Sequence, residues 1–139
     1  MPEMSSIPES LRSFAERYTA AGCSQIPDRV ANHYSPSGSL CINHGAPAVG
    51  RAEIADAARS FMTAFPDMQV RMDRLIQSTQ GIEYHWTLTG TNTGPGGTGH
   101  CVEIRGFERW KMGREGFIEE SQGQFDESLY LHQLKHGVH

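Results

Sequence analysis

Acidic and amide side chains recur at every second position in one segment near the end of the chain, and a single glutamate stands among apolar residues in the segment before it; these groups could move protons. Glu120, Gln122 and Asp126 share the parity of Ile118, and Glu108 shares the parity of the apolar residues around it. Successive side chains of a β-strand point to opposite faces, so this spacing predicts that these polar groups face inward. A β-bulge at a glycine of either segment would reverse the assignment.

A carboxylate such as Asp126 inside an apolar cavity has a raised pKa, because burial disfavours its charged form. It then becomes a better proton donor and acceptor near neutral pH, which general acid/base catalysis requires. A structural role is the alternative, because an Asp directly before a helix is a common N-cap. The sequence leaves both roles open, and they do not exclude each other.

Glu108 and Glu120 allow two arrangements. Paired inside the molecule, they would raise each other's pKa, as carboxylates that share a site do. Alternatively, Glu108 forms an ion pair with Arg105 or Arg109, which is the more ordinary arrangement in a sheet. The sequence leaves both arrangements open.

Two histidines have neighbours that predict opposite orientations. His44 has the parity of Leu40 and Ile42, and an imidazole can move protons near pH 7, so His44 is a candidate catalytic residue. The alternative for His44 is a loop histidine that only forms hydrogen bonds. His85 has the parity of the polar residues around it, which predicts the outer sheet face and a structural or interface role.

Aromatic side chains supply the apolar walls that such groups need. Tyr84 and Trp86 alternate with polar residues in the run that begins at Glu83. The glycine- and threonine-rich sequence that follows, up to Gly99, looks like a phosphate loop. It lacks the Gly-Lys-Ser/Thr ending of such a loop and does not open a helix. We interpret it as a wide turn between two antiparallel strands.

The other reactive side chains have no arrangement that indicates a site. No set of His, Cys, Asp and Glu has the spacing of a metal site, and there is no Gly-x-Ser-x-Gly elbow. Cys23, Cys41 and Cys101 lack Cys-x-x-Cys spacing, and we interpret them as free, packed thiols. We therefore expect no metal site.

Hydrophobic periodicity predicts the elements that position these residues. The predicted helices cover residues 6–21, 27–34, 51–65 and 127–135. The predicted strands cover residues 39–44, 68–77, 82–91, 101–112 and 117–124. Helices followed by an antiparallel meander predict an α+β architecture, with the helices on one face of a curved sheet.

The composition limits the class of protein. The chain has 139 residues, which favours a single domain. Its net charge of −4, without blocks of like charge, argues against nucleic acid and anionic membranes as partners. No apolar run approaches the roughly 18 residues that a membrane-spanning helix needs. Residues 1–8 lack the pattern of a signal peptide, so we expect a cytoplasmic location.

Several short motifs occur together between about Asp28 and Leu134. They are Ala-Phe-Pro-Asp-Met at residues 64–68, His-Trp-Thr at 85–87, Gly-Thr-Asn-Thr-Gly at 90–94, Thr98-Gly99, Gly50, Phe125-Asp126 and Gln133-Leu134. In this combination the chain resembles the SnoaL-like group within the nuclear transport factor 2-like superfamily. Each motif alone is a weak signal, and their combination is the specific one.

The resemblance implies a cone-shaped α+β fold, in which N-terminal helices pack on the concave face of a curved antiparallel sheet and enclose a pocket. Such proteins are usually dimers, and we expect a homodimer through the outer sheet face. The founding members close polyketide rings by an intramolecular aldol step, using an acidic residue and no metal or organic cofactor. Asp126 matches the position of that acidic residue. His44 stands at the family's spacing for a pocket histidine.

These expectations combine into a protein that binds a small, largely apolar organic molecule in an internal pocket. As an enzyme it would be a cofactor-free acid/base catalyst of the aldol cyclase, isomerase, dehydratase or hydrolase type. Asp126 would be the acid/base, with His44 and Glu120 assisting. The expected substrate-binding residues are Tyr84, Trp86, Glu108, Trp110, Gln122 and Phe61. The alternative is a non-catalytic ligand-binding or dimeric accessory domain, and a carboxylate and a histidine that converge on one point would favour catalysis.

Overall fold

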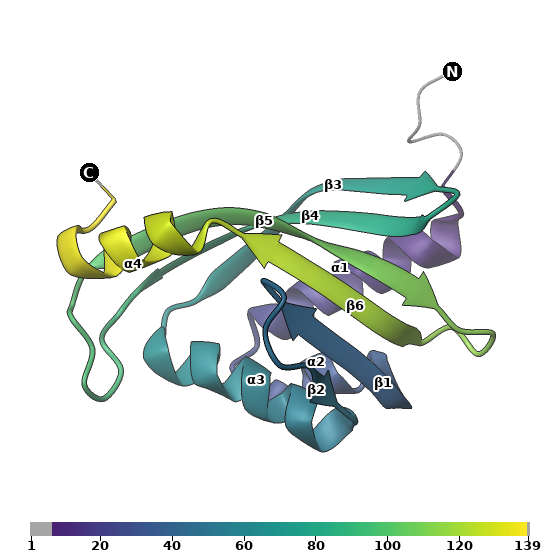
Figure 1. Ribbon diagram of the computed structural model, residues 1–139, viewed down its shortest axis with the longest axis horizontal. Coiled ribbons are helices and arrows are strands. Elements are labelled where there is room, and N and C mark those ends of the chain that lie inside the picture. Colours follow the sequence, from purple (N-terminus) through teal and green to yellow (C-terminus); the bar gives the residue numbers. More distant parts are fainter. Residues whose placement is uncertain (1–6, 139) are drawn as a thin grey trace.

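Four helices and six strands account for most of residues 7–138, which the computed structural model describes (Figure 1). Helix α1 (Glu9–Gly22) buries a stripe of residues at helical spacing, and α3 (Arg51–Ala64) does the same. The buried residues are Phe14, Ala15, Tyr18 and Ala21 in α1, and Ile54, Ala55 and Met62 in α3. Both helices were predicted. The predicted start of the first one, at Ser6, lies outside the described residues.

The joint between the second helix and the first strand differs from the prediction. Helix α2 (Pro27–Ala31) is short, and Tyr34 already begins β1 (Tyr34–Ile42). Strand β1 pairs with β6 at Tyr34 and again from Ser39, with an irregular register between them. Pro36 lies in this gap, where its missing N–H removes no ladder hydrogen bond. The predicted helix up to Tyr34 was therefore too long, and the predicted strand began too late.

The six strands lie in the order β2-β1-β6-β5-β4-β3 in one sheet. The predicted antiparallel meander is formed by β3 (Gln69–Ser78), β4 (Gly81–Thr91), β5 (Cys101–Met112) and β6 (Ile118–Phe125). Strand β1 joins it parallel to β6, and β2 (Ala48–Val49) adds a short antiparallel pair at the edge. The α+β class is confirmed. The sheet is mixed rather than purely antiparallel, because the first strand lies beside the last.

The N-terminal helices lie on one side of the sheet, and the long strands β4 and β5 bend over them (Figure 1). The sheet residues that face these helices form the core, and the largest fully buried ones include Leu75, Tyr84, Trp110 and Ile118. Helix α4 (Glu127–His136) continues from β6 and contacts β5. This arrangement leaves the inner face of the sheet lined on one side by α1 and α3.

A bulge in β6 decides which polar side chains face inward. The strand carries one extra residue, Glu119, between its pairs with Lys111 and Met112. Ile118 and Ser121 are therefore both buried, although they lie three positions apart. Beyond the bulge, the alternation of inward and outward side chains is shifted by one residue. The side chains of Glu120, Gln122 and Asp126, which were predicted to face inward, therefore face outward.

Some features are absent from residues 7–138. No helix there is long and apolar enough to span a membrane. No group of three or more His, Cys, Asp and Glu side chains in this range could hold a metal ion. Cys23, Cys41 and Cys101 are free, as predicted, but Cys101 is exposed rather than packed. The cytoplasmic location stays a prediction.

Candidate functional site

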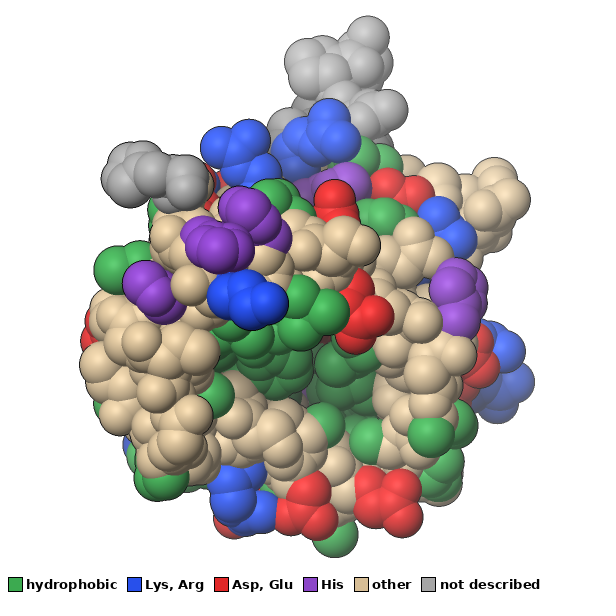
Figure 2. All heavy atoms as spheres, turned by 60° about the vertical axis from the view of Figure 1, so that its left-hand side comes forward, with side chains coloured by type: hydrophobic (Ala, Val, Ile, Leu, Met, Phe, Trp, Pro, Cys, Tyr) green, Lys and Arg blue, Asp and Glu red, His purple; other side chains and the backbone are tan. Residues whose placement is uncertain are grey.

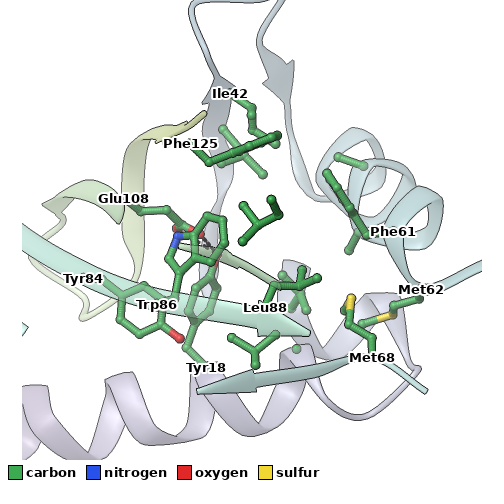
Figure 3. A pocket seen from close by; sticks show the side chains of 18 of the residues that line it. Tyr18, Ile42, Phe61, Met62, Met68, Tyr84, Trp86, Leu88, Glu108 and Phe125 are labelled. Atoms are coloured by element: carbon green, nitrogen blue, oxygen red, sulfur yellow. Dashed lines mark hydrogen bonds between the residues drawn. The ribbon is translucent and has the colours of Figure 1, made fainter. Parts of the chain in front are cut away.

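A cavity of about 140 Å³ lies between the inner face of the sheet and the helices α1 and α3 (Figure 3). Most of the side chains that line it are apolar. They include Leu40, Ile42, Met62, Met68, Val70, Leu88, Ile104 and Phe125. Figure 2 shows a hollow filled with hydrophobic side chains on the side of the molecule that carries α3 and α4.

Glu108 is the one carboxylate among the described residues that line this cavity. It projects from the inner face of β5, as its parity with Trp110 predicted. The side chain keeps some accessible surface although it lies deep in the fold, because this surface borders the cavity. A single carboxyl group thus interrupts an otherwise largely apolar wall.

Hydrogen-bond donors from four residues hold the carboxylate of Glu108 in place. Its Oε1 accepts from Trp110 Nε1 at 2.9 Å and from Ser121 Oγ at 2.9 Å. Tyr18 OH lies 3.0 Å from Oε1 and 3.2 Å from Oε2, and Tyr34 OH lies 3.5 Å from Oε1. Among the described residues, Oε2 therefore accepts only from Tyr18. Since a carboxylate oxygen can accept about two hydrogen bonds, Oε2 has capacity for a ligand.

Burial raises the pKa of Glu108, because loss of water disfavours the charged form. The hydrogen bonds from Trp110, Ser121, Tyr18 and Tyr34 stabilise the carboxylate and partly oppose this effect. The pKa values of Tyr18 and Tyr34 are raised well above that of an ordinary tyrosine, first by burial and then by the charge of Glu108. Both phenols therefore stay neutral and keep their O–H donors. A carboxyl group with a raised pKa binds a proton more readily than an ordinary carboxylate does.

Aromatic residues form the wall beside Glu108. Tyr84 stacks on Trp110, with ring centroids 4.9 Å apart and an interplanar angle of 17°. Tyr84 OH lies 2.6 Å from Thr19 Oγ1. Phe125 packs against Trp86, with centroids 6.2 Å apart. These contacts give the cavity an aromatic, largely apolar wall on this side.

Most of the predicted substrate-binding residues come together here. Phe61, Tyr84, Trp86 and Glu108 line the cavity. Trp110 is fully buried behind Tyr84 and reaches the site through its hydrogen bond to Glu108. Gln122 does not belong to the site, because the bulge in β6 places it on the exposed outer face.

Asp126 lies at the end of β6 and does not line the cavity. Its side chain is exposed, and Oδ1 accepts from the backbone N–H of Leu129 at 3.0 Å, as the N-cap of α4. This is the structural role that the sequence left open. The expected apolar surroundings of Asp126 are not found, because the shifted parity of β6 turns the side chain outward.

His44 and Glu120 also lie away from the cavity. Asn43 and His44 have positive φ angles of 52° and 59°, so the chain turns after β1 and carries the imidazole to the surface. His44 Nε2 lies 3.1 Å from Gln124 Nε2, as in a hydrogen-bonded loop histidine. Glu120 is exposed, so the predicted pair with Glu108 does not form. Among residues 7–138, no histidine lines the cavity.

The predicted ion pair between Glu108 and an arginine is not found within residues 7–138 either. Arg109 Nη2 lies instead 3.3 Å from Glu83 Oε2 on the outer sheet face. His85 Nε2 lies 3.1 Å from Glu83 Oε1, and the His85 ring stacks on Phe107 with centroids 5.5 Å apart. His85 is therefore on the outer face, as its parity predicted. Its role in an interface stays a prediction.

Tyr18, Tyr34 and Ser121 complete the site, although sequence reasoning did not assign them to it. They come from α1, β1 and β6, and Tyr18 is 90 positions away from Glu108. One signal was available, because a tyrosine on a buried stripe needs a partner for its O–H. The sequence did not indicate which partner.

Solved structures share this fold at low sequence identity. A protein described as a SnoaL-like polyketide cyclase from Jannaschia sp. CCS1 has a TM-score of 0.80 and 14% identity, with 94% of each chain covered. A protein with a ketosteroid isomerase-like fold from Catenulispora acidiphila DSM 44928, solved with trimethylamine, has a TM-score of 0.76 and 16% identity. This match covers 92% of this chain and 93% of that one.

SalBIII is described as an epoxide hydrolase/cyclase-like enzyme in pyran ring formation in the polyether salinomycin. It has a TM-score of 0.73 and 13% identity, and the match covers 85% of this chain and 92% of that one. No curated protein matches the chain. A family model, SnoaL-like polyketide cyclase, matches residues 12–134, which is most of the chain. The resemblance seen in the sequence motifs is thereby confirmed, and the chain belongs to the SnoaL-like polyketide cyclase family.

Proposed function

We propose that the cavity binds a small, largely apolar organic molecule and that Glu108 acts on it as a cofactor-free acid/base. One observation carries this proposal: a carboxyl group with a raised pKa borders an otherwise largely apolar cavity. Burial of the ligand's apolar surface against aliphatic and aromatic walls supplies the affinity. The polar group of the ligand faces Glu108.

Glu108 takes a proton from the bound molecule through Oε2, the oxygen with spare capacity. The donors on Oε1 hold the carboxyl group in one orientation, so the base is positioned before the ligand arrives. The same proton returns to another atom of the ligand, as in an isomerisation, or to the oxygen that becomes a hydroxyl in an aldol ring closure. The ligand therefore gains back the proton that it lost, and no other proton donor or acceptor is needed.

Glu108 replaces Asp126 as the proposed acid/base. A catalytic base must come within hydrogen-bond distance of the proton that it removes. The positions of Asp126, His44 and Glu120 outside the cavity lining do not meet this condition. The family description supports polyketide cyclisation as the class of reaction, and the description of SalBIII supports epoxide hydrolysis or cyclisation. Isomerisation and dehydration stay in the proposal as expectations from the sequence.

Hydrogen–deuterium exchange tests the acid/base role without knowledge of the natural substrate. The probe is 2-indanone, a small flat ketone whose α-protons exchange in D2O when a base is held beside them, and ¹H NMR measures the rate. We expect wild type to accelerate the exchange. Glu108→Gln should lower the protein-dependent rate at least about 100-fold, because an amide of nearly the same shape cannot take the proton.

Glu103→Gln is the matched control for this experiment. It makes the same chemical change on the same strand, at an exposed position of the outer face. The control should exchange 2-indanone protons at the wild-type rate. Equal rates in wild type and Glu108→Gln would contradict the proposed role of Glu108.

Ligand binding without catalysis is the second candidate function. The observation that favours it is the set of hydrogen-bond donors around Glu108 Oε1. A buried polar cluster whose hydrogen bonds are satisfied can have a purely structural role, in which it selects one packing of the core. In that case 2-indanone raises the melting temperature of both wild type and Glu108→Gln. Neither protein then accelerates exchange.

We also propose that two copies associate through the outer sheet face. This face carries side chains of both charges, which a two-fold related copy can pair in register. They are Asp73 and Glu83 with Arg71, Arg105 and Arg109. Arg109 Nε is buried and has no hydrogen-bond partner among the described residues, so an acceptor from a second copy would stabilise it.

A further inference from the structure

We infer that Trp86 recognises the ligand through its indole N–H, which donates to a carbonyl-type oxygen of the molecule bound beside Glu108. This inference rests on the proposed function and names a group that the ligand must carry. From the sequence, Trp86 was expected to be an apolar wall only. The structure adds a polar atom to that wall.

The observation behind the inference is an unpaired donor. Trp86 Nε1 is buried and has no hydrogen-bond partner among residues 7–138. The chain's other indole differs, because Trp110 Nε1 donates to Glu108 at 2.9 Å. A buried donor without a partner is destabilising, and such groups are rare in native proteins unless a ligand or water completes them.

The nitrogen edge of the Trp86 ring faces the strand that carries Glu108. Cζ2 and Cη2 of the ring lie 2.6 and 2.9 Å from the position that a Cβ would take at Gly106 of β5. Nε1 is separated from Cζ2 by a single ring atom, so it lies on this edge. In the sheet, Trp86 pairs with Gly106 and Tyr84 pairs with Glu108, which makes Trp86 and Glu108 diagonal neighbours on the inner face. Figure 3 shows the indole nitrogen on the side of the ring toward Glu108.

A carbonyl oxygen placed between Trp86 and Glu108 satisfies the unpaired donor. It has lone pairs and no proton, which matches an N–H group. The Trp86 ring borders the free space of the cavity, and the inference requires this ring to turn when the ligand binds, so that Nε1 reaches the ligand oxygen. When Glu108 removes a proton next to the carbonyl, negative charge develops on this oxygen, and the hydrogen bond from Trp86 becomes stronger.

Acetophenone and α-methylstyrene test the inference because they have nearly the same shape. Acetophenone carries a carbonyl oxygen that can accept a hydrogen bond, and α-methylstyrene has a CH2 group in its place. Isothermal titration calorimetry gives the Kd of each compound for wild type and for Trp86→Phe, which keeps an aromatic wall and removes the N–H. In the variant, the Kd ratio of acetophenone to α-methylstyrene should rise about fivefold. This factor corresponds to one hydrogen bond of ordinary strength. An unchanged ratio would contradict a bond from Trp86.

The indole resonances provide a readout that a purely structural role would not move. In ¹⁵N-labelled wild type, the Trp86 Nε1–H signal should shift downfield with acetophenone and not with α-methylstyrene, while Trp110 serves as the internal reference. This measurement uses the wild-type chain, so it stands even where Trp86→Phe folds poorly. If both compounds bind and the Trp86 signal responds equally to each, the inference is wrong and ligand binding remains. If neither compound binds to wild type, the proposed function fails and the inference fails with it.

Discussion

The carboxyl group of Glu108 experiences two opposing effects at the scale of one residue. Burial disfavours its charge, while the donors of Trp110, Ser121, Tyr18 and Tyr34 favour it, and the net result is a raised pKa. A group balanced in this way can change its protonation without leaving its place. The balance also makes the folding stability depend on pH.

The stability of Glu108→Gln relative to wild type should therefore change with pH. A raised pKa means that the folded chain binds this proton more tightly than the unfolded chain does. The contribution of Glu108 is complete below the unfolded-state pKa of about 4.3 and is lost as the pH rises through the folded-state value. We expect the free energy of unfolding of the variant minus that of wild type to increase as the pH rises above the unfolded-state pKa of about 4.3. Urea unfolding measures both values.

Carboxylates with a lowered pKa change the free energy of unfolding with pH in the opposite direction, but their contributions cancel when the variant is compared with wild type. Hydrogen bonds from Thr91 lower the pKa of Asp67, so its contribution to stability is lost as the pH falls. It is present in both proteins and leaves the difference unchanged. Glu103→Gln, measured in the same way, should show no such trend. A difference for Glu108→Gln that stays flat or falls with rising pH would contradict a raised pKa.

At the scale of elements, single residues decide how strands and helices present their side chains. The bulge at Glu119 reverses the parity of β6 and turns Asp126 to the surface, where it caps α4. Gly106 lets the Trp86 ring pack directly on β5. The shape of the cavity wall thus depends on backbone features that carry no reactive group.

Asp126→Ala should lower the free energy of unfolding by about 1 kcal/mol, because α4 loses its N-cap. Asp126→Ser should recover most of this loss, since a serine hydroxyl can accept the same hydrogen bond. Thermal unfolding of the three proteins measures the effect. If Asp126→Ser keeps its stability but loses 2-indanone exchange, the catalytic role suggested by the sequence would be supported instead.

Gly106→Ala should destabilise the sheet far more than Gly123→Ala. A Cβ at Gly106 would lie 2.5 Å from the carbonyl oxygen of Gln124 and 2.6 Å from Trp86 Cζ2, whereas the nearest atoms at Gly123 are 3.6 Å away. Overpacking of this kind costs about 1–3 kcal/mol, while an unstrained alanine reduces the entropy of the unfolded chain and can stabilise by up to about 1 kcal/mol. Urea unfolding of the two variants compares them. Equal stabilities would mean that Trp86 does not pack on Gly106.

At the scale of the whole molecule, the sheet separates two surfaces with different chemistry. Its inner face and the helices enclose the cavity, while its outer face carries the ion pairs of Glu83 with Arg109 and His85. Ligand and partner would therefore meet opposite faces of the same strands.

The proposed homodimer predicts a mass in solution of about twice the 15.4 kDa of one chain, measured by light scattering after gel filtration. Phe107→Asp should shift the protein to the monomer, because it places a charge on the outer face beside His85. Val49→Asp, the same kind of change at an exposed position on the edge strand β2, should leave the dimer intact. A monomeric wild type would rule out the homodimer at the concentration measured.

The sequence by itself determined the family, the α+β class and most of the elements. Strand β5 has the predicted bounds, Cys101–Met112, and the inward position of Glu108 followed from its neighbours. These features depend on the alternation of apolar and polar residues within a few positions, which is a local property of the chain. The family followed from short motifs, which are local as well.

Only the tertiary structure decided which carboxylate borders the cavity. The bulge at Glu119 moves Glu120 and Asp126 outward, and a bulge depends on how two strands pair rather than on the residues of one. The donors around Glu108 come from α1, β1, β5 and β6, and Tyr18 lies 90 positions away from the carboxylate it contacts. Periodicity shows which face a residue occupies, but it does not show which distant residue occupies the opposite wall. Burial and hydrogen bonding, which set the pKa of Glu108, arise only when those distant walls meet.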